Sequence, residues 1–543
     1  MIGEWLIVVL LATLPGSDAA FVGPELQQLA WSAQGSLGPE RLLANSRAAE
    51  TFSGAAAGAG FDLGLWFGHA RSSDLLLHLI LVTLGVSVLG VAKMAAPEPR
   101  KVRAGRQYSL CLSGGGYRAA LFHLGALRRL HETGILPQVA KISSVSGGSL
   151  LMGFLATRSS SAFKEHGLDP DDFEREIAQP FRDFVKGDRR TWQALQNLTV
   201  NLVLRDRRLS TFIADLERSF GSKTLGELPK QPEIVFCATD LGFGVNWIFR
   251  RKKDDDGRRL SRSNDGSGSY RAGYVDLDSW SIARCAAISA SFPPIFGPYR
   301  LGVPADKFIR RPKDGRDRDD AIRDNLHLSD GGIYDNLGLE PIWPPVEGST
   351  LLISDAGAPF EFRASSRLPW RMIHRYLQVS QVQAQKLRHR SVIERKAMAG
   401  EDFEYAEWRI GVRHRKKLAN PEPASFGYHD GVVGRIERIR TDLDHFSEAE
   451  AQILENHGYA CAERSLAYYL PSHLSGRPEP RLPHAELDPS REGCEPTHVV
   501  KALSGSHKRF SFSRWFAAAR PSRPSTSEGP SAPDTGTRAE AIS

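Results

Sequence analysis

The sequence predicts an α/β domain over residues 107–470, and two observations support this fold class. The segment alternates short apolar runs, typical of buried strands, with runs whose apolar residues recur every three or four positions, typical of helices. Two of the strand-like runs also pass through a glycine-rich turn directly into a helical pattern, at 114–116 and at 146–148. Alternation of this kind indicates a sheet flanked by helices.

Length and composition leave room for one large domain with appendages. The chain has 543 residues, more than one hydrophobic core usually organises, and 41% of them are hydrophobic. The net charge of +7 could favour an anionic partner, either nucleic acid or acidic lipid. The basic runs are interleaved with acids, however, because 250–253 (RRKK) leads directly into 254–256 (DDD). We therefore expect solvated surface there and no nucleic-acid partner.

The cysteines and the other possible metal ligands limit which kinds of site the sequence can form. All five cysteines stand singly, so they form neither a zinc pattern nor a disulfide framework, and their odd number fits a reducing compartment. Cys111, Cys237 and Cys285 lie in apolar strings and are expected in the core. Because no cluster of metal ligands stands out in the sequence, neither a metal nor another cofactor is expected.

The N-terminal region contains two apolar runs. Residues 1–20 are a possible signal peptide or a short apolar helix, although the start of the chain carries Glu4 and no basic residue. Residues 75–92 contain no formal charge and are a candidate transmembrane helix, with a buried core helix as the alternative. Between them, residues 21–74 are rich in Gly and Ala and have no assigned role.

Basic residues on either side of 75–92 predict how this apolar run is oriented in the membrane. Only Arg71 lies close before it, near two aspartates, whereas several cations follow it: Lys93, Arg100, Lys101, Arg103 and Arg106. By the positive-inside rule, the chain after Lys93 is expected in the cytoplasm, anchored to the membrane. At the other end, residues 471–543 are rich in Pro, Ser and Arg and are expected to form a largely disordered tail.

The first candidate motif is a glycine turn. An apolar strand, residues 108–113, runs into Gly114, Gly115 and Gly116 and then into a helical pattern. Glycines permit positive φ and close approach of the backbone, and the free N–H groups at a helix start attract negative charge. The turn also half-matches a dinucleotide-binding fingerprint, but the acidic residue that this fingerprint needs after the second strand is missing.

The second motif places a serine in a tight turn. A strand at 142–145 leads into Ser146, then Gly147, and then an apolar helix. This pattern resembles the G-x-S-x-G nucleophile elbow, in which a serine is presented on a strained turn. Ser143, Ser144 and Ser149 are rivals, but only Ser146 has a small residue two positions to either side. A Ser/Gly-rich loop without chemistry is the alternative.

The third motif brings a carboxylate to the end of a strand. The apolar run at 326–330 ends in Asp330, and Gly331 and Gly332 form the turn that follows. A carboxylate in this place could accept a proton from a serine hydroxyl, orient a histidine, or only cap the turn.

Taken in this order, the three motifs closely resemble the patatin-like phospholipase family. Segments 235–241 and 286–294 also look like that family's strand and its A-S-x-A-x-P segment. Residues 440–459 are similar to the helix near the end of the family's domain, with a capping box formed by 447 and 450. Ala119 stands where the family's loop often has glycine. The resemblance covers 107–470 and implies a patatin-like, mostly parallel central sheet behind a membrane-associated N-terminal region.

The resemblance implies a serine acyl hydrolase that works without histidine. Carried over residue by residue, Ser146 is the nucleophile and Asp330 the general base of a Ser–Asp dyad. Arg118 matches the family's basic position and would steady the loop or hold a substrate phosphate, with a surface salt bridge as the alternative. The expected substrate is a phospholipid or glycerolipid at a membrane surface, and no protein activator can be inferred. The oxyanion hole would use the N–H groups of Gly114, Gly115, Gly116 and Gly147.

Two alternative functions remain open. One is an α/β-hydrolase in which Ser146 works with an acid and a later histidine, such as His374 or His389. The other is a membrane-anchored binding or scaffold protein whose patatin-like domain has lost catalysis. Retention of both Ser146 and Asp330 argues against the second alternative.

Overall fold

A computed structural model describes most of the chain after residue 107. The described residues are 108–158, 163, 169–187, 206–252, 266–293, 295–309, 319–345, 349–360, 369–412, 426–488, 496–504 and 506. They belong to one compact unit, 99–543. The predictions for 1–20, 21–74 and 75–92 lie outside these residues. Within the described ranges, none of the helices has the length and apolarity needed to span a bilayer.

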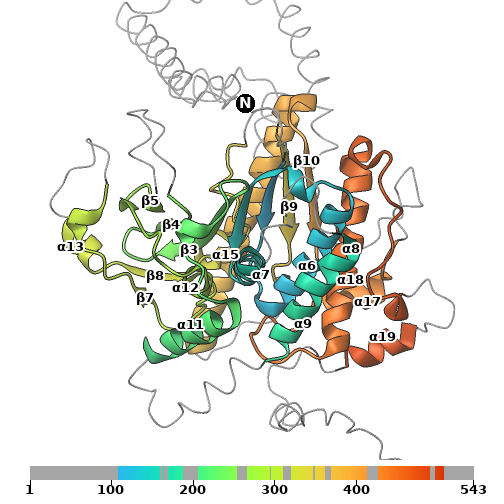
Figure 1. The fold of residues 1–543 in the computed structure, drawn as a ribbon, viewed down its shortest axis with the longest axis horizontal. Helices are drawn as coiled ribbons and strands as arrows, with labels where there is room; N and C mark the ends of the chain where they lie inside the picture. Colours follow the sequence, from blue (N-terminus) through green and yellow to red (C-terminus); the bar gives the residue numbers. More distant parts are fainter. Residues whose placement is uncertain are drawn as a thin grey trace, which may run out of the picture. The chain divides into compact units, whose positions relative to one another are not determined.

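The centre of the fold is a ten-stranded mixed sheet (Figure 1). One half is parallel, in the order β10-β9-β1-β2-β3. Its strands are β1 (Tyr108–Leu112), β2 (Val139–Val145), β3 (Glu233–Asp240), β9 (Thr350–Asp355) and β10 (Tyr405–Arg409). The other half is antiparallel and continues from β3. It contains β4 (Val245–Phe249), β5 (Ser267–Ser269), β6 (Gly273–Val275), β7 (Tyr299–Arg300) and β8 (His327–Asp330).

The α/β class is therefore confirmed, and the expected parallel sheet applies to only one half of the sheet. The antiparallel half is assembled from short strands of two to five residues; β5 and β6 are joined by a turn, whereas α12 lies between β6 and β7 and α13 lies between β7 and β8. The short turn between β5 and β6 permits only antiparallel pairing, because a parallel pair needs a long crossover. In the parallel half, β1, β2 and β9 are buried along nearly their whole length, as expected for strands covered on both faces.

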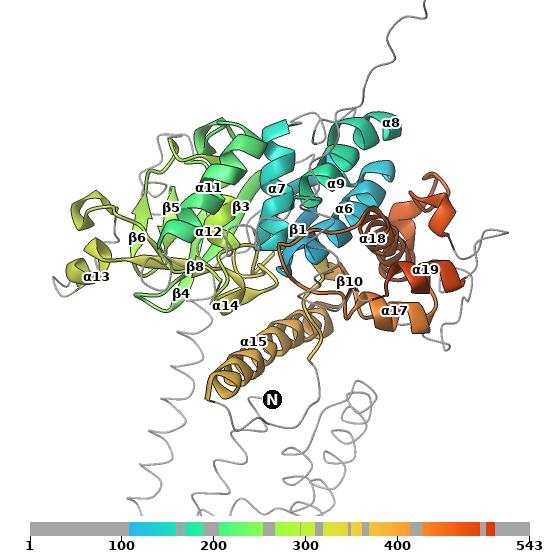
Figure 2. The same ribbon diagram turned by 90° about the horizontal axis from the view of Figure 1, so that it is seen from below.

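Helices cover both faces of the sheet. In Figure 2, α6, α7, α11, α12 and α18 lie on one side and the long helix α15 lies on the other. The larger helices are α6 (Gly116–Glu132), α7 (Gly147–Arg158), α11 (Asp206–Phe220), α12 (Ile282–Ser289), α15 (Pro369–Ala399) and α18 (Glu448–Tyr469). Shorter helices are α8 (Pro170–Phe173), α9 (Gln179–Val185), α13 (Asp320–Asp324), α14 (Gly332–Asp335), α17 (Asp430–Ile436) and α19 (Pro496–Ala502). Single turns of 3-10 or π helix complete the described fold: Leu136–Gln138, Glu174–Ala178, Leu225–Glu227, Ala305–Lys307, Gly400–Asp402, Pro471–Leu474 and Ala485–Leu487.

Helices α6 and α18 pack backbone against backbone. A Cβ on Gly125 of α6 would lie 1.8 Å from the Glu455 carbonyl oxygen, and one on Gly458 of α18 would lie 1.8 Å from that of Phe122. Any larger residue at either position would force the helices apart. The capping box expected at the start of α18 is present, formed by Ser447 and Glu450.

The folded domain extends beyond residue 470. In α19, Val499 is fully buried, and Leu503 just after the helix is 4% exposed. Upstream of it, His484 hydrogen-bonds to the buried Glu455 of α18 over 2.8 Å. The boundary expected at 470 is therefore too early, because segments rich in Pro and Arg can still dock through a few apolar residues and one ion pair. The cysteines expected in the core, 111, 237 and 285, are all buried.

Candidate active site

Ser146 occupies the turn between β2 and α7, and its backbone is strained. It is the one non-glycine residue with positive φ among the described residues, at φ +50°. That conformation is unfavourable for a residue with a Cβ, so the surrounding structure must enforce it. A serine held in this way at a strand-to-helix turn is the geometry of a nucleophile elbow. The side chain lies in a largely enclosed site, with 9% of the residue exposed.

Two glycines after the serine let the turn close. A Cβ on Gly147 would lie 2.1 Å from the carbonyl oxygen of Gly116, and one on Gly148 would lie 2.6 Å from that of Leu112. The elbow is thus packed directly against the end of β1 and the glycine turn that follows it. This contact brings the first two sequence motifs together.

The side chains of the three alternative serines make polar contacts inside the fold. Ser143 Oγ lies 3.3 Å from Cys237 Sγ, and Ser144 Oγ donates to the Val235 carbonyl at 3.1 Å. Ser149 Oγ donates to Ser144 Oγ at 3.1 Å. All three are fully buried. These contacts leave Ser146 as the serine of this segment that faces the acidic side chain described next.

Asp330 ends β8 and is 1% exposed. Its Oδ1 accepts a hydrogen bond from the Gly332 N–H at 2.7 Å. Burial raises the pKa of Asp330 to about 7, against the lowering effect of hydrogen bonds from Gly332 and from the Ser146 hydroxyl. Oδ2 has no partner of standard hydrogen-bond geometry among the described residues, so the Ser146 contact is looser than the Gly332 bond. A catalytic pair is often loose before substrate binds.

Strand register explains how residues so distant in sequence meet. Val145 pairs with Cys237 across β2 and β3, and Asp330 pairs with Ala238 across β8 and β3. Ser146, one residue after Val145, is therefore level with Ala238. Strand β8 reaches that level from the opposite direction, because it is antiparallel to β3. The hydroxyl and the carboxylate approach each other across one shared strand.

The glycine turn lies against the elbow. A Cβ on Gly114 would come within 3.1 Å of Ser146 Cβ and 2.4 Å of Asn336 Oδ1. The N–H of Gly114 donates to the Asn336 carbonyl at 3.0 Å. This N–H is therefore already used in the fold, and it holds the turn beside the serine.

The other N–H groups of the turn remain as donors. Gly115 has φ +146° and Gly116 φ +61°, conformations that favour glycine. No hydrogen bond from the N–H groups of Gly115, Gly116 or Gly147 occurs within the described part of the chain. Gly116 and Gly147 also begin α6 and α7, so both N–H groups point outward from helix starts. Unsatisfied donors at two helix starts beside a serine hydroxyl can stabilise a developing oxyanion.

Comparison with protein families identifies the fold that carries this site. Residues 110–343 match a family model described as patatin-like phospholipase. The chain carries a patatin-like phospholipase domain. This match over residues 110–343 supports lipid acyl hydrolysis as the general activity. Among curated proteins, none matches the sequence.

Solved structures give more distant likenesses. VipD from Legionella pneumophila is 15% identical with a TM-score of 0.27, covering 68% of this chain and 70% of that one. Human GIVD cytosolic phospholipase A2 is 11% identical with a TM-score of 0.35, covering 74% of this chain and 60% of that one. The same human enzyme in complex with methyl gamma-linolenyl fluorophosphonate is 12% identical, with a TM-score of 0.36 over 68% and 59%. These scores are low, so the family match identifies the domain.

Arg118 of the patatin-like domain is buried, and it connects separate segments of the backbone through hydrogen bonds. It is 1% exposed, and its guanidinium donates to the carbonyls of Ala356 at 2.7 Å and of Glu437 and Ile439 at 3.0 Å each. A side chain so enclosed is not a surface salt bridge. Its donors point to backbone carbonyls, which favours the loop-steadying interpretation over contact with a substrate phosphate.

His389 belongs to a cluster of charged residues with Asp355 and Glu407. Its Nε2 lies 3.5 Å from Asp355 Oδ2 and its Nδ1 lies 3.1 Å from Glu407 Oε1. The two carboxylates raise the pKa of His389 to about 9, although burial lowers it. These three residues could also hold a metal ion, but the carboxylates face different ring nitrogens. That arrangement suits a doubly protonated imidazolium, since a metal would bind one nitrogen only. The side chain of His374 lies outside the described residues.

Two residues of the patatin-like site escaped sequence reasoning. Ser289 accepts the Ser146 N–H at 3.0 Å and donates to the Cys237 carbonyl at 2.6 Å, so it fixes the strained turn. Asn336 lies between the glycine turn and the turn after Asp330. Ser289 lies inside the segment 286–294 and Asn336 lies just after the turn at Gly331 and Gly332, but a single polar residue gives no signal of its partner in the sequence.

Proposed function

We propose that this protein is a serine acyl hydrolase that cleaves ester-linked fatty acids from phospholipids or glycerolipids through a Ser146–Asp330 dyad. The observation that supports it most is a strained, positive-φ serine beside a buried carboxylate whose pKa is about 7. A base poised near neutral pH can accept a hydroxyl proton without being permanently protonated. Family membership supports the lipid substrate class.

In the first half-reaction, Ser146 Oγ attacks the ester carbonyl carbon and its proton passes to Asp330. The carbonyl oxygen becomes negative and is stabilised by the N–H groups of Gly115, Gly116 and Gly147. The intermediate then collapses and the bond to the leaving alcohol breaks. The alcohol takes the proton from Asp330, which leaves an acyl ester on Ser146.

In the second half-reaction, water attacks the acyl ester and gives its proton to Asp330. The same N–H groups stabilise the second oxyanion. Collapse returns the proton to Ser146 Oγ and releases the fatty acid. The dyad ends in its starting protonation state, so neither a metal nor another cofactor enters the cycle.

Location at a membrane is part of the proposal. A phospholipid or glycerolipid is presented by a lipid surface, and the chain contains the apolar segment 75–92 followed by basic residues. Anchoring by that segment would place residues 99–543 beside the substrate on the cytoplasmic side. Basic residues near the surface would add attraction to anionic headgroups.

Labelling with a fluorophosphonate probe tests the nucleophile. The full chain is treated with the probe, and the modified residue is located by peptide mass spectrometry. We expect the label on Ser146 and none in the Ser146→Ala protein, whereas Ser219→Ala, in α11, should label normally. A chain that folds but is not labelled would favour the non-catalytic scaffold alternative.

Product analysis tests the substrate. The same three proteins are incubated with vesicles of mixed phospholipids and triacylglycerol, and the released fatty acids are identified. Release is expected from the wild type and from Ser219→Ala, and a loss of about 10⁴-fold or more from Ser146→Ala. Release that persists in Ser146→Ala would place the chemistry elsewhere.

A further inference from the structure

Helix α15 combines an excess of cations with exposed apolar side chains. Over 31 residues it carries one acidic side chain, Glu394, against seven cations: Arg371, Arg375, Lys386, Arg388, Arg390, Arg395 and Lys396. It also carries several of the large hydrophobic side chains that the fold leaves exposed: Tyr376, Leu377, Val379, Leu387, Ile393 and Met398. A helix that combines exposed apolar residues with an excess of cations is typical of a segment lying on an anionic membrane.

The inner face of α15 is bound to the active-site turns. Gln381 donates to the Gly332 carbonyl at 3.1 Å, and Gln385 donates to Asp355 at 2.8 Å. Arg388 pairs with Asp335 at 3.1 Å. Gly332 is the residue whose N–H binds Asp330, so α15 contacts the turn that carries the base.

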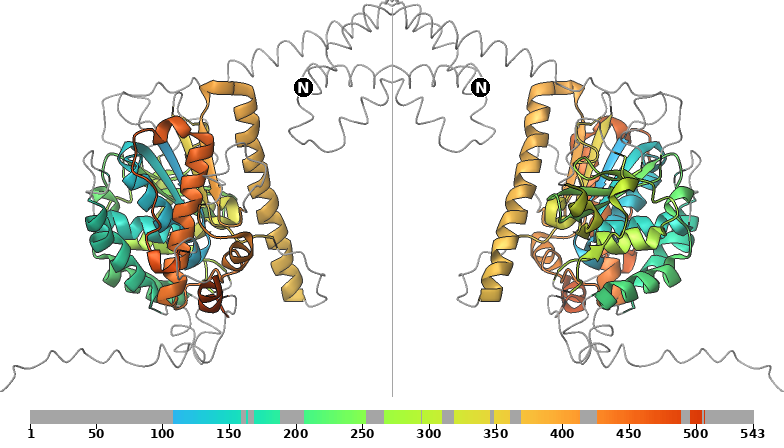
Figure 3. Two further views of the ribbon diagram at one scale, coloured as in Figure 1. Left: turned by 90° about the vertical axis from the view of Figure 1, so that its right-hand side faces the viewer. Right: turned by 90° about the vertical axis from the view of Figure 1, so that its left-hand side faces the viewer.

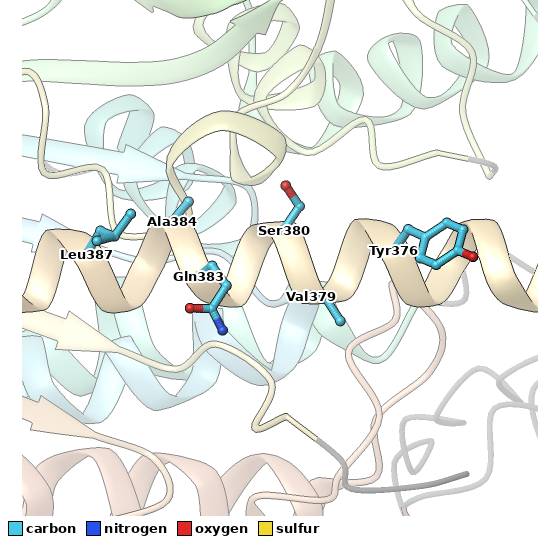
Figure 4. Close-up of a pocket in the computed structure, with 6 residues that line it drawn as sticks. All are labelled: Tyr376, Val379, Ser380, Gln383, Ala384 and Leu387. Carbon is cyan, nitrogen blue, oxygen red and sulfur yellow. The ribbon is translucent and has the colours of Figure 1, made fainter. Parts of the chain in front are cut away.

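The outer face of α15 is exposed. At 3.6 residues per turn, Tyr376, Val379, Leu387 and Met398 fall on the half of the helix opposite Gln381, Gln385 and His389, and Leu377 and Ile393 fall near the two edges between these halves. Tyr376 is 63% exposed, Leu387 58% and Met398 69%. Tyr376 and Leu387 border a shallow pocket along the helix, together with Val379, Ser380, Gln383 and Ala384 (Figure 4). Figure 3 shows the helix standing along one side of the domain, its outer face directed away from the sheet.

From these observations we infer that α15 is a docking helix for an anionic lipid surface. The apolar side chains insert at the level of the headgroups, and Lys386, Arg390 and Arg395 pair with lipid phosphates. The charge excess favours lipid over a second copy of this chain, because two such faces would repel each other. This inference rests on the proposed function, since docking brings the turn of Asp330 to the surface that holds the substrate.

A fluorescent probe on the helix tests docking directly, without requiring catalysis. The full-length chain with Cys494→Ser and Leu387→Cys is labelled with an environment-sensitive thiol reagent; the cysteines 111, 237, 285 and 461 are buried. The matched control carries the probe at Ala214→Cys, an exposed position of α11 on the opposite side of the sheet. Both proteins are mixed with vesicles of phosphatidylcholine, with or without phosphatidylglycerol.

On phosphatidylglycerol vesicles, the probe at 387 should shift to shorter wavelength and become protected from iodide quenching. The probe at 214 should not change. Equal responses at both positions, or none at 387, would overturn the inference. A blue-shifted, protected probe at 387 before any vesicle is added would assign the face to a protein contact, and would overturn it as well. Repeating the measurement in Ser146→Ala keeps the result independent of the proposed chemistry.

Reversing the charges on α15 tests whether docking affects hydrolysis. The triple variant Lys386→Glu, Arg390→Glu, Arg395→Glu should lose at least about tenfold in hydrolysis of anionic vesicles and stay within about twofold on a soluble short-chain ester. The control reverses three charges outside α15: Arg175, Arg218 and Lys230. Equal losses in both triple variants would contradict docking by α15. Failure of the wild type on both substrates would count against the proposed function and would leave the probe measurement to decide on docking.

Discussion

The two halves of the sheet contribute to the site in different ways. The parallel half supplies the proposed nucleophile and oxyanion donors, each from a strand that runs through a glycine turn into a helix. The antiparallel half supplies the proposed base from β8, a strand of four residues that reaches the site through its pairing with β3. The first arrangement is local in sequence and the second depends on register between distant segments.

This difference indicates where the site is robust and where it is sensitive. The elbow is held by close backbone packing of Gly147 and Gly148 against the end of β1 and its glycine turn, and by the hydrogen bond from the Ser146 N–H to Ser289. The carboxylate is held by its place in a ladder and by a single N–H bond from Gly332. A slip of one residue in β8 would turn Asp330 to the other face of the sheet and remove the base.

The largest expected effect follows from removing the base of the antiparallel half. Asp330→Asn keeps the size of the side chain but cannot accept the Ser146 proton, so kcat should fall by about 10³-fold with little change in KM. Steady-state kinetics on vesicles would measure both constants. A fall confined to KM would contradict the role of Asp330 as base.

A smaller loss is expected from disturbing the parallel half. Gly147→Ala places a Cβ 2.1 Å from the Gly116 carbonyl oxygen and should separate the elbow from the glycine turn. We expect kcat to fall by about 100-fold, the scale of one lost oxyanion donor. The control is Gly431→Ala in α17, where a Cβ would meet nothing within 4 Å. Equal activity of the two variants would show that this contact does not matter.

The pH dependence should report the buried carboxylate. Since the pKa of Asp330 is raised to about 7, kcat/KM should fall about tenfold for each pH unit below that value. A flat profile between pH 5 and 8 would contradict this assignment.

The raised pKa has a matching effect on stability. A pKa raised by folding makes the wild type lose stability as pH rises from about 4 to about 7, because the unfolded carboxyl ionises first. Asp330→Asn escapes this loss, so its Tm advantage should be largest above pH 7 and vanish near pH 4.

A smaller decrease in kcat is expected from replacing Ser289, which links the two halves of the sheet. Ser289→Ala removes the acceptor of the Ser146 N–H and the donor to Cys237 of β3. Leaving buried groups unsatisfied costs about 1–3 kcal/mol, and a relaxed elbow should lower kcat by about tenfold. The serine control is Ser391→Ala on α15, whose hydroxyl only bonds back to its own helix. Thermal unfolding and kinetics that match this control would show that Ser289 is dispensable.

The smallest effect is expected at the histidines. His374→Ala and His389→Gln should each retain activity on a soluble ester within about threefold, because the dyad uses no imidazole. A loss of about 10⁴-fold in either variant would instead indicate a catalytic triad.

The same division explains what could be predicted from the sequence. The strands β1 and β2, the helices after them and the turn at Ser146 were predicted, because apolar periodicity and glycines act locally. The strand that ends at Asp330 was predicted as well, but the antiparallel pairing of β4 to β8 was not, because that pairing depends on register between distant segments. Asp330 was found through its resemblance to a family motif, whereas Ser289 and Asn336 have no local signature. The burial of Arg118 could not be predicted from the sequence either, since its carbonyl partners lie more than 200 positions away.

The closure of the glycine turn by the chain near residue 440 has a practical consequence. A Cβ on Gly116 would lie 2.4 Å from the Thr441 carbonyl oxygen, and the Asp442 carbonyl accepts the Tyr117 N–H at 3.2 Å. Both carbonyls lie about a hundred residues beyond the segment that the family model matches. A truncated protein that stops at residue 343 would therefore leave one wall of the turn open to solvent and should be inactive. Recombinant fragments should retain α18 and α19 if they are to hydrolyse anything.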